Sequence, residues 1–150
     1  YSSDGELAAP LPDAIHVAFH PYRDEVVWVD QAGCGKRWRI GGELEELGCD
    51  LRTAHFVGRD VIAWDGQSLL KVGDEGRQSL CRASQPPLAQ VFGQLALADG
   101  NRLLLVDAAC EPQSSVKLPT RPVAVAEAGD NKAFIQDITG AVQRVVFRSE

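Results

Sequence analysis

The chain has 150 residues, of which 45% are apolar, and its formal net charge is −6 with an isoelectric point near 5.0. This acidic balance argues against direct nucleic-acid binding, because proteins that hold phosphates carry a positive surface. No apolar run approaches the roughly 20 residues that cross a bilayer, so we expect no membrane contact in this segment. The sequence contains no methionine, even at position 1, which favours a segment of a longer protein.

Short runs of alternating apolar and polar residues begin after residues 1–12, which we interpret as an N-terminal extension or linker. Alternation with period two is typical of β-strands that bury one face, and Gly, Asp, Asn or Pro interrupts it every few residues. The pattern predicts an all-β fold with twelve strands: 15–19, 25–30, 36–40, 52–57, 60–65, 68–72, 88–92, 94–99, 102–107, 122–128, 132–137 and 141–147. The acidic stretch 43–47 is too short for a stable helix and is predicted to be a loop.

These strands fall into four groups of three, and each group has an Asp after its second strand. Asp followed by Gly is a hairpin signal, because both residues tolerate the positive φ that a tight turn requires. The four Asp residues are separated by 35, 34 and 38 positions: Asp30, Asp65, Asp99 and Asp137. Phe19, Phe56 and Phe92 end the first strands of three groups with a similar spacing. The repeat of about 36 residues predicts β-propeller blades at about 13–50, 51–86, 87–121 and 122–150.

The first group, IHVAFHPYRDEVVWVDQAGCGKRWRI, resembles a blade of the WD-repeat class, and a divergent propeller of another lineage is the alternative. The resemblance covers about residues 14–150 and implies that the chain is part of a larger propeller. Four blades are fewer than the common ring contains, and an open stack leaves its end faces uncovered. Three ways to complete the ring remain open: chain outside this segment, which we favour, blades from another subunit, or a small four-bladed ring.

Four cysteines, Cys34, Cys49, Cys81 and Cys110, are 15, 32 and 29 residues apart and lack the paired spacing of zinc sites. We expect reduced, half-buried thiols, with two disulfides as the alternative for an extracellular chain. This expectation goes with an intracellular location, in the cytoplasm or nucleus.

No catalytic, cofactor or metal site is predicted. His16 and His20 share one face of a strand, but four extended residues span about 13 Å, too far for two ligands of one ion even with His55 nearby. No G-x-S-x-G sequence accompanies the serines. The glycines of GCGKRW lead into a strand, whereas a phosphate loop leads into a helix. The three tryptophans are predicted to pack between blades.

Function in a propeller normally lies in the loops. The longest interruptions, 41–50 and 73–87, carry charged residues, and we predict a partner-binding site there: Glu43, Glu45, Glu46, Asp74, Glu75 and Arg77. The chain is therefore expected to be a non-catalytic scaffold that binds other protein subunits within a multi-subunit assembly. The alternative is a ligand-binding or enzymatic propeller whose central-channel site is completed by blades outside this segment.

Overall fold

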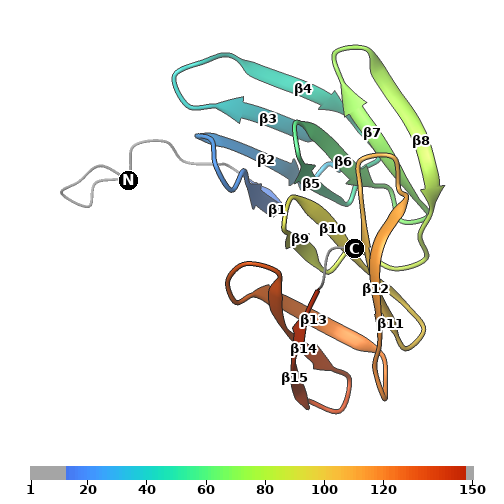
Figure 1. The fold of residues 1–150 in the computed structure, drawn as a ribbon. Helices are drawn as coiled ribbons and strands as arrows, with labels where there is room; N and C mark the ends of the chain where they lie inside the picture. The colour runs from blue at the N-terminus through green and yellow to red at the C-terminus, as the bar shows by residue number, and fades with distance from the viewer. Residues whose placement is uncertain (1–12, 148–150) are drawn as a thin grey trace.

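The computed structural model describes residues 13–147, and the predicted extension 1–12 lies outside them. Within the described range the chain forms fifteen β-strands and no helix, arranged in four small antiparallel sheets (Figure 1). The all-β fold with four repeats is confirmed, and the four sheets are arranged as successive blades of a β-propeller. No helix of residues 13–147 has the length and apolarity to cross a membrane.

Each sheet uses its strands in chain order, from the inner strand of the propeller outward. The bounds in blade 1 are β1 Ala14–Phe19, β2 Glu25–Asp30, β3 Gly35–Arg39 and β4 Leu44–Gly48, and in blade 2 they are β5 Thr53–Val57, β6 Asp60–Trp64, β7 Ser68–Gly73 and β8 Gly76–Arg82. Blade 3 contains β9 Ala89–Val91, β10 Gln94–Asp99, β11 Arg102–Val106 and β12 Pro112–Lys117, and blade 4 contains β13 Pro122–Glu127, β14 Lys132–Asp137 and β15 Val142–Val146.

The outer strands β4, β8 and β12 were not predicted, and the expected loops 41–50 and 73–87 are largely strand. Each of these strands is mostly exposed and polar, with sequences such as GRQSLCR in β8 and PQSSVK in β12. An outer strand packs on one neighbour only, so it lacks the apolar alternation that reveals the inner strands. Of the charged residues in these stretches, Glu45, Glu46 and Arg77 lie on outer strands, and Glu43, Asp74 and Glu75 lie in the turns that precede them.

Aspartates fix three of the hairpins as predicted. The Oδ1 of Asp30 accepts hydrogen bonds from the backbone N–H of Ala32 and Cys34, at 2.9 and 3.0 Å. Asp65 and Asp137 make equivalent turns. Bonds from backbone N–H groups lower the pKa of the Asp30 and Asp65 carboxyls, and a hydrogen bond from the Thr139 hydroxyl, with backbone bonds, lowers the pKa of Asp137.

The third blade differs from the predicted pattern. Asp99 ends β10 opposite Arg102, in a hairpin closed by only Gly100 and Asn101. Asp107, after β11, takes the turn-forming role and accepts hydrogen bonds from the backbone N–H of Ala109 and Glu111. The β10–β11 hairpin is too short for a turn in which the aspartate accepts bonds from residues two and four positions later. In blade 3 that turn lies between β11 and β12, and Asp107 forms it.

Three apolar clusters fill the junctions between consecutive blades. Blades 1 and 2 bury Val27, Val29, Phe56 and Val61 among others. The next junction contains Trp64, whose indole N–H donates to the backbone oxygen of Ala83 at 2.8 Å. Ile135 packs in the cluster between blades 3 and 4. Each buried side chain of this size contributes roughly 1.5–3 kcal/mol to folding, so the junctions hold the blades together.

The cysteines form two disulfides, so the expectation of reduced thiols is wrong. Cys34–Cys49 joins the β2–β3 turn to the end of β4 within blade 1. Cys81–Cys110 joins β8 of blade 2 to the β11–β12 turn of blade 3. Three of these cysteines lie in or beside the outer strands, so pairing could not be inferred before those strands were known.

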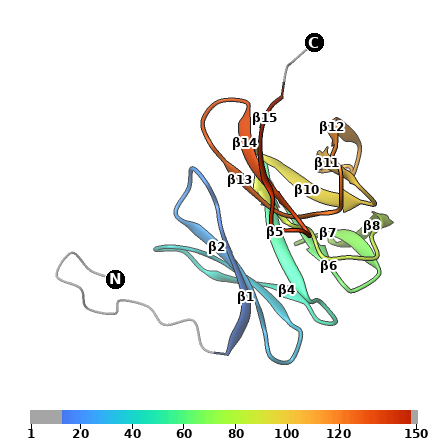
Figure 2. The same ribbon diagram turned by 90° about the horizontal axis from the view of Figure 1, so that it is seen from below.

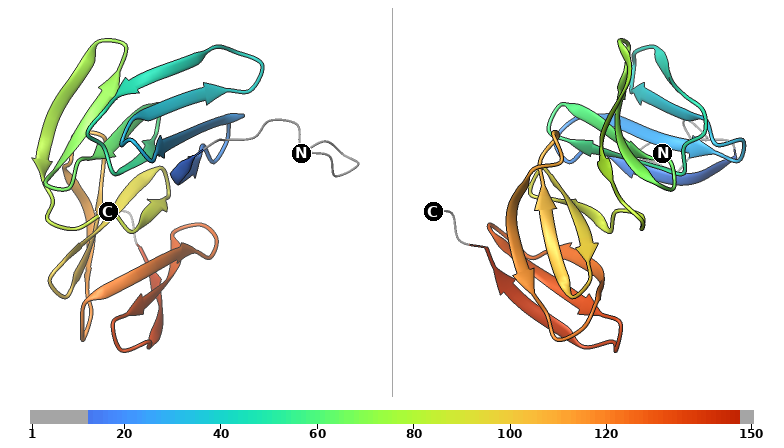
Figure 3. Two further views of the ribbon diagram at one scale, coloured as in Figure 1. Left: turned by 180° about the vertical axis from the view of Figure 1, so that it is seen from behind. Right: turned by 90° about the vertical axis from the view of Figure 1, so that its right-hand side faces the viewer.

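The blades follow one another along an arc, and blades 1 and 4 lie at its ends. The right-hand view of Figure 3 separates the blue and red sheets at opposite ends, and Figure 2 shows the same order from below. In the described part of the chain, most strand contacts between sheets involve the inner strands β1, β5, β9 and β13 of consecutive blades with β2 and β10, and β4 also contacts β7 between the outer parts of blades 1 and 2. Gln90 adds a link across the inner ends of the blades.

Candidate partner-binding surface

All six residues predicted to bind a partner line two shallow clefts between the outer parts of blades 1 and 2. The clefts have volumes of about 390 and 560 Å³. Glu43 lies in the β3–β4 turn, with Glu45 and Glu46 on β4. The two acidic residues from blade 2, Asp74 and Glu75, form the β7–β8 turn. The clefts therefore combine the two sequence stretches, which are about 30 residues apart.

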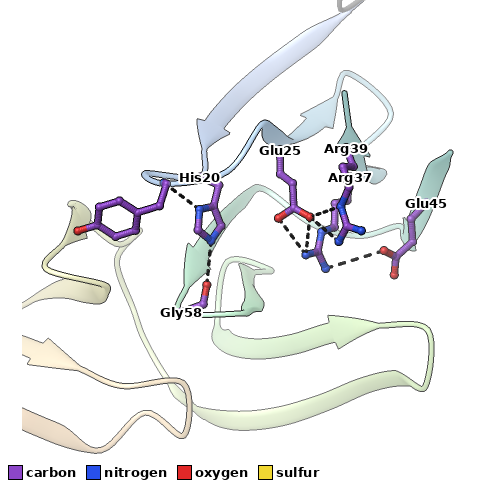
Figure 4. Close-up of polar contacts among 7 residues, drawn as sticks. His20, Glu25, Arg37, Arg39, Glu45 and Gly58 are labelled. Carbon is purple, nitrogen blue, oxygen red and sulfur yellow. Dashed lines mark hydrogen bonds and ion pairs between the residues drawn. The ribbon is translucent and has the colours of Figure 1, made fainter. Parts of the chain in front are cut away.

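An ion cluster forms the floor of this surface (Figure 4). The side chain of Glu25 is only 1% exposed, and its two carboxylate oxygens lie 2.7 Å from Arg39 Nη2 and 3.2 Å from Arg37 Nη2. Burial alone would raise the pKa of Glu25, but hydrogen bonds from Arg39 and Arg37, together with their charges, hold it below its usual value. Glu25 is therefore a carboxylate at neutral pH.

The cluster connects the two blades. The guanidinium of Arg37 lies over the ring of Phe56 in blade 2, 5.7 Å from the ring centroid, while its Nη1 lies 3.9 Å from Glu45. On the other side of the junction, Arg77 donates to the backbone oxygen of Cys49 at 2.6 Å. The charged surface is thus attached to the buried junction, which limits how far these side chains can move.

Glu45 and Asp74 form a pair of neighbouring carboxyls from different blades. Burial raises the pKa of Glu45, and the hydrogen bond and negative charge of Asp74 raise it further, while the charge of Arg37 opposes them. Both carboxyls line the same two clefts, and neighbouring carboxyls favour a cation between them. This surface can therefore accept a lysine or arginine side chain.

A second group of polar side chains lies at the inner ends of the blades. His20 Nδ1 accepts from the backbone N–H of Tyr22 at 3.1 Å, so Nε2 carries the proton and donates to the oxygen of Gly58, also at 3.1 Å (Figure 4). The Oε1 of Gln90 accepts from the N–H of Phe56, and its Nε2 donates to the oxygen of Phe19. Glu127 accepts from the N–H of Phe92. A small cavity of about 140 Å³ here is lined by residues of all four blades.

The histidines do not form a metal site. His16 and His55 pack edge to face with ring centroids 4.9 Å apart, and the Nδ1 of His16 accepts a long bond from Ala54 N–H. Burial, assisted by the charge of His16, lowers the pKa of His55 to about 3. Among residues 13–147, no group of three or more His, Cys, Asp or Glu is placed to hold a metal ion.

Four residues of these sites were not predicted from the sequence: Glu25, Arg37 and Arg39, which organise the charged surface, and Gln90, which connects three blades. The ion cluster could have been predicted from the pairing of strands in the first predicted hairpin. A hairpin closed after Asp30 pairs Glu25 with Arg39 and Val27 with Arg37, so these charges share one face of the sheet. Gln90 had no such signal, because its partners are 34 and 71 residues away.

No protein-family model matches the chain, and no curated protein is significantly similar to it in sequence. Solved structures do resemble it in fold. The computationally designed protein Ika4 matches with a TM-score of 0.58 and 20% identity, over 98% of this chain and 96% of Ika4. A second computationally designed protein, Ika8, matches with a TM-score of 0.56 and 18% identity, over 89% of this chain and 46% of Ika8.

BamB from Moraxella catarrhalis, a propeller, matches with a TM-score of 0.56 and 10% identity, over 87% of this chain and 45% of BamB. The chain thus spans nearly all of Ika4 but about half the length of Ika8 and BamB. At such low identities the likeness concerns the fold alone, and it supports the propeller architecture.

Proposed function

We propose that this propeller is a non-catalytic scaffold that binds another protein through the clefts between blades 1 and 2, as a subunit of a larger assembly. The observation that carries the proposal is that two carboxyls from different blades, Glu45 and Asp74, line both clefts above an ion cluster. A lysine or arginine of the partner would lie between them and remove their mutual repulsion. Such a charge-assisted contact is about twice as strong as a neutral hydrogen bond.

The rigidity of the surface supports this role. Glu25 fixes both arginines of β3, and the Cys34–Cys49 disulfide anchors the end of β4. A site that is already ordered loses less side-chain entropy when a partner binds. Glu43, Glu46, Glu75 and Arg77 surround the pair and would set the orientation of the partner.

Two further features belong to the proposal. Membership of the WD-repeat class rests on the form of the first blade, AFHP followed by a hairpin, and is proposed on that ground alone.

Disulfides are typical of oxidising compartments. The two disulfides therefore support a scaffold outside the cytoplasm and nucleus, in contrast to the location expected from the sequence.

The test compares proteins captured by the wild-type chain with those captured by the double variant Glu45→Lys with Asp74→Lys, using quantitative mass spectrometry. We expect partners to be retained by the wild type and reduced at least tenfold by the variant, because two attractive charges become repulsive. A control variant, Asp99→Lys with Glu111→Lys, alters two exposed carboxylates of blade 3 and should capture normally. Equal capture by all three proteins contradicts the proposal.

A second candidate is ligand binding in the cavity at the inner ends of the blades. It is favoured by the convergence of His20, Tyr22, Gln90 and Glu127 from three blades on one cavity of about 140 Å³. This volume suits only a small polar molecule, and we assign no catalytic role to these residues. Protection of His20 from diethyl pyrocarbonate by a bound small molecule would favour this candidate over the scaffold.

A further inference from the structure

Every blade has two faces, and the junctions within the chain always use them in the same way. We define the forward face of a blade as the one toward the next blade in the chain and the backward face as the opposite one. Val27 and Val29 on the forward face of blade 1 meet Val61 and Ala63 on the backward face of blade 2. The other two junctions repeat this forward-to-backward arrangement. Within residues 13–147, no apolar cluster joins another blade to the backward face of blade 1 or to the forward face of blade 4, and we call these two the free faces.

The free backward face of blade 1 is apolar. Register places Phe19, Val26, Trp38 and Leu44 in one row across its four strands. Phe19 is 68% exposed and Leu44 is 51% exposed, although the equivalent Phe56 of blade 2 is 1% exposed. Val26, which lies between them in this row, is only 5% exposed, so Phe19 and Leu44 are two exposed apolar groups on one face. Large exposed apolar side chains that share one face indicate an interaction surface.

The free forward face of blade 4 is also apolar. Phe134 of β14 alternates with the buried Ala133 and Ile135 and is 46% exposed. On the neighbouring strand β15, Val142 and Val146 are 60% and 52% exposed. Ala133 and Ile135 face blade 3, so Phe134 points to the side where a following blade would pack.

We propose that these two faces pack against each other between two copies of this chain, blade 4 of each copy on blade 1 of the other. Two such junctions, related by a twofold axis, close a ring of eight blades and leave no end face exposed. The junction between copies is then a fourth example of the forward-to-backward contact that the chain already makes three times.

Charge complementarity favours a second copy as the occupant. Lys132 and Arg144 share the free face of blade 4, because they lie opposite Val146 and Phe134. On blade 1, Asp30 and Glu46 lie on the free face with the single base Lys36. Opposite charges thus border the two apolar rows.

The test measures the molar mass of the wild-type chain by light scattering after size-exclusion chromatography, and then of two variants. Phe19→Glu damages blade 1 only, and Phe134→Glu damages blade 4 only. We expect twice the 16.2 kDa chain mass for the wild type and a single chain mass for each variant alone. A mixture of the two variants should recover the double mass in part, because one of the two junctions in the mixed pair is undamaged.

Ser115→Glu, which adds the same charge to exposed strand β12 of blade 3, is the matched control and should remain double. Circular dichroism checks that every variant keeps its β-sheet. A single chain mass for the wild type overturns the proposal, as does a double mass that survives both variants. If only Phe19→Glu dissociates the pair, blade 1 meets blade 1 and the forward-to-backward arrangement is wrong. The variants leave Glu45 and Asp74 intact, so failure here does not affect the proposed partner site.

Discussion

Phe19 and Phe56 occupy equivalent positions near the ends of the first strands of blades 1 and 2, yet Phe19 is 68% exposed and Phe56 is 1% exposed. Both lie on the backward face of their blade. Phe56 is covered by blade 1 and lies beneath the guanidinium of Arg37, whereas blade 1 itself has no preceding blade in the described chain. Whether a side chain on a backward face is buried therefore depends on the presence of a preceding blade, and less on the residue type or on the strand that carries it.

The largest expected effect on the free energy of unfolding comes from removing the buried side chain, Phe56. In a Phe134→Glu background, where copies do not pair, Phe56→Ala should lower the free energy of unfolding by about 3–5 kcal/mol, because it leaves a cavity between blades 1 and 2. Phe19→Ala in the same background should change it by less than about 0.5 kcal/mol. Urea denaturation followed by tryptophan fluorescence measures both values, and equal losses would contradict the account of the two faces.

A second test concerns the covered junction between blades 2 and 3. Replacing Cys81 and Cys110 by serine should lower the free energy of unfolding by about 3.5 kcal/mol, since the disulfide closes a loop across that junction. The matched variant without Cys34 and Cys49 should lose about 3 kcal/mol, because its loop is shorter. Intact-mass spectrometry of the wild type should show four hydrogens fewer than the reduced chain. Four free thiols in the purified protein would refute both disulfides.

The smallest expected effect is the pH dependence of the free energy of unfolding that a buried histidine causes. His55 is buried in blade 2, and its pKa is lowered from 6.5 to about 3, so the unfolded chain binds a proton more readily than the folded one. The stabilisation is complete above pH 6.5 and decreases as the pH falls toward 3. We expect a loss of about 2 kcal/mol between pH 7 and pH 5. His55→Leu should reduce that pH dependence by about this amount, and an unchanged slope would show that His55 is not buried as described.

Sequence pattern predicted the first three strands of each blade well, because these strands are rich in apolar residues that alternate or form short buried runs between turn residues. All twelve predicted strands are present, including 60–65 and 94–99, which correspond to β6 and β10. The outer strands β4, β8 and β12 could not be predicted this way, since they face solvent and carry mostly polar residues. The error in the cysteines followed from this omission.

The candidate site was predicted only in part. The charged stretches 41–50 and 73–87 suggested a surface, and the structure brings Glu45 and Asp74 together. Their proximity depends on how blade 2 packs on blade 1, which no local pattern specifies. The same limit applies to the end faces. Phe19, Phe56 and Phe134 all lie in apolar strand sequences, and only the order of the blades makes the side chain of Phe56 buried and those of Phe19 and Phe134 exposed.

The most direct test of the account replaces Phe19 by the photoreactive phenylalanine analogue p-benzoylphenylalanine and identifies the residues that it crosslinks. The predicted product has twice the chain mass, and its crosslinked peptides come from residues 122–146 of the second copy, around Phe134. Crosslinks to residues 122–146 within a product of single chain mass would mean that blades 1 and 4 close a four-bladed ring in one chain, and they would contradict the paired end faces.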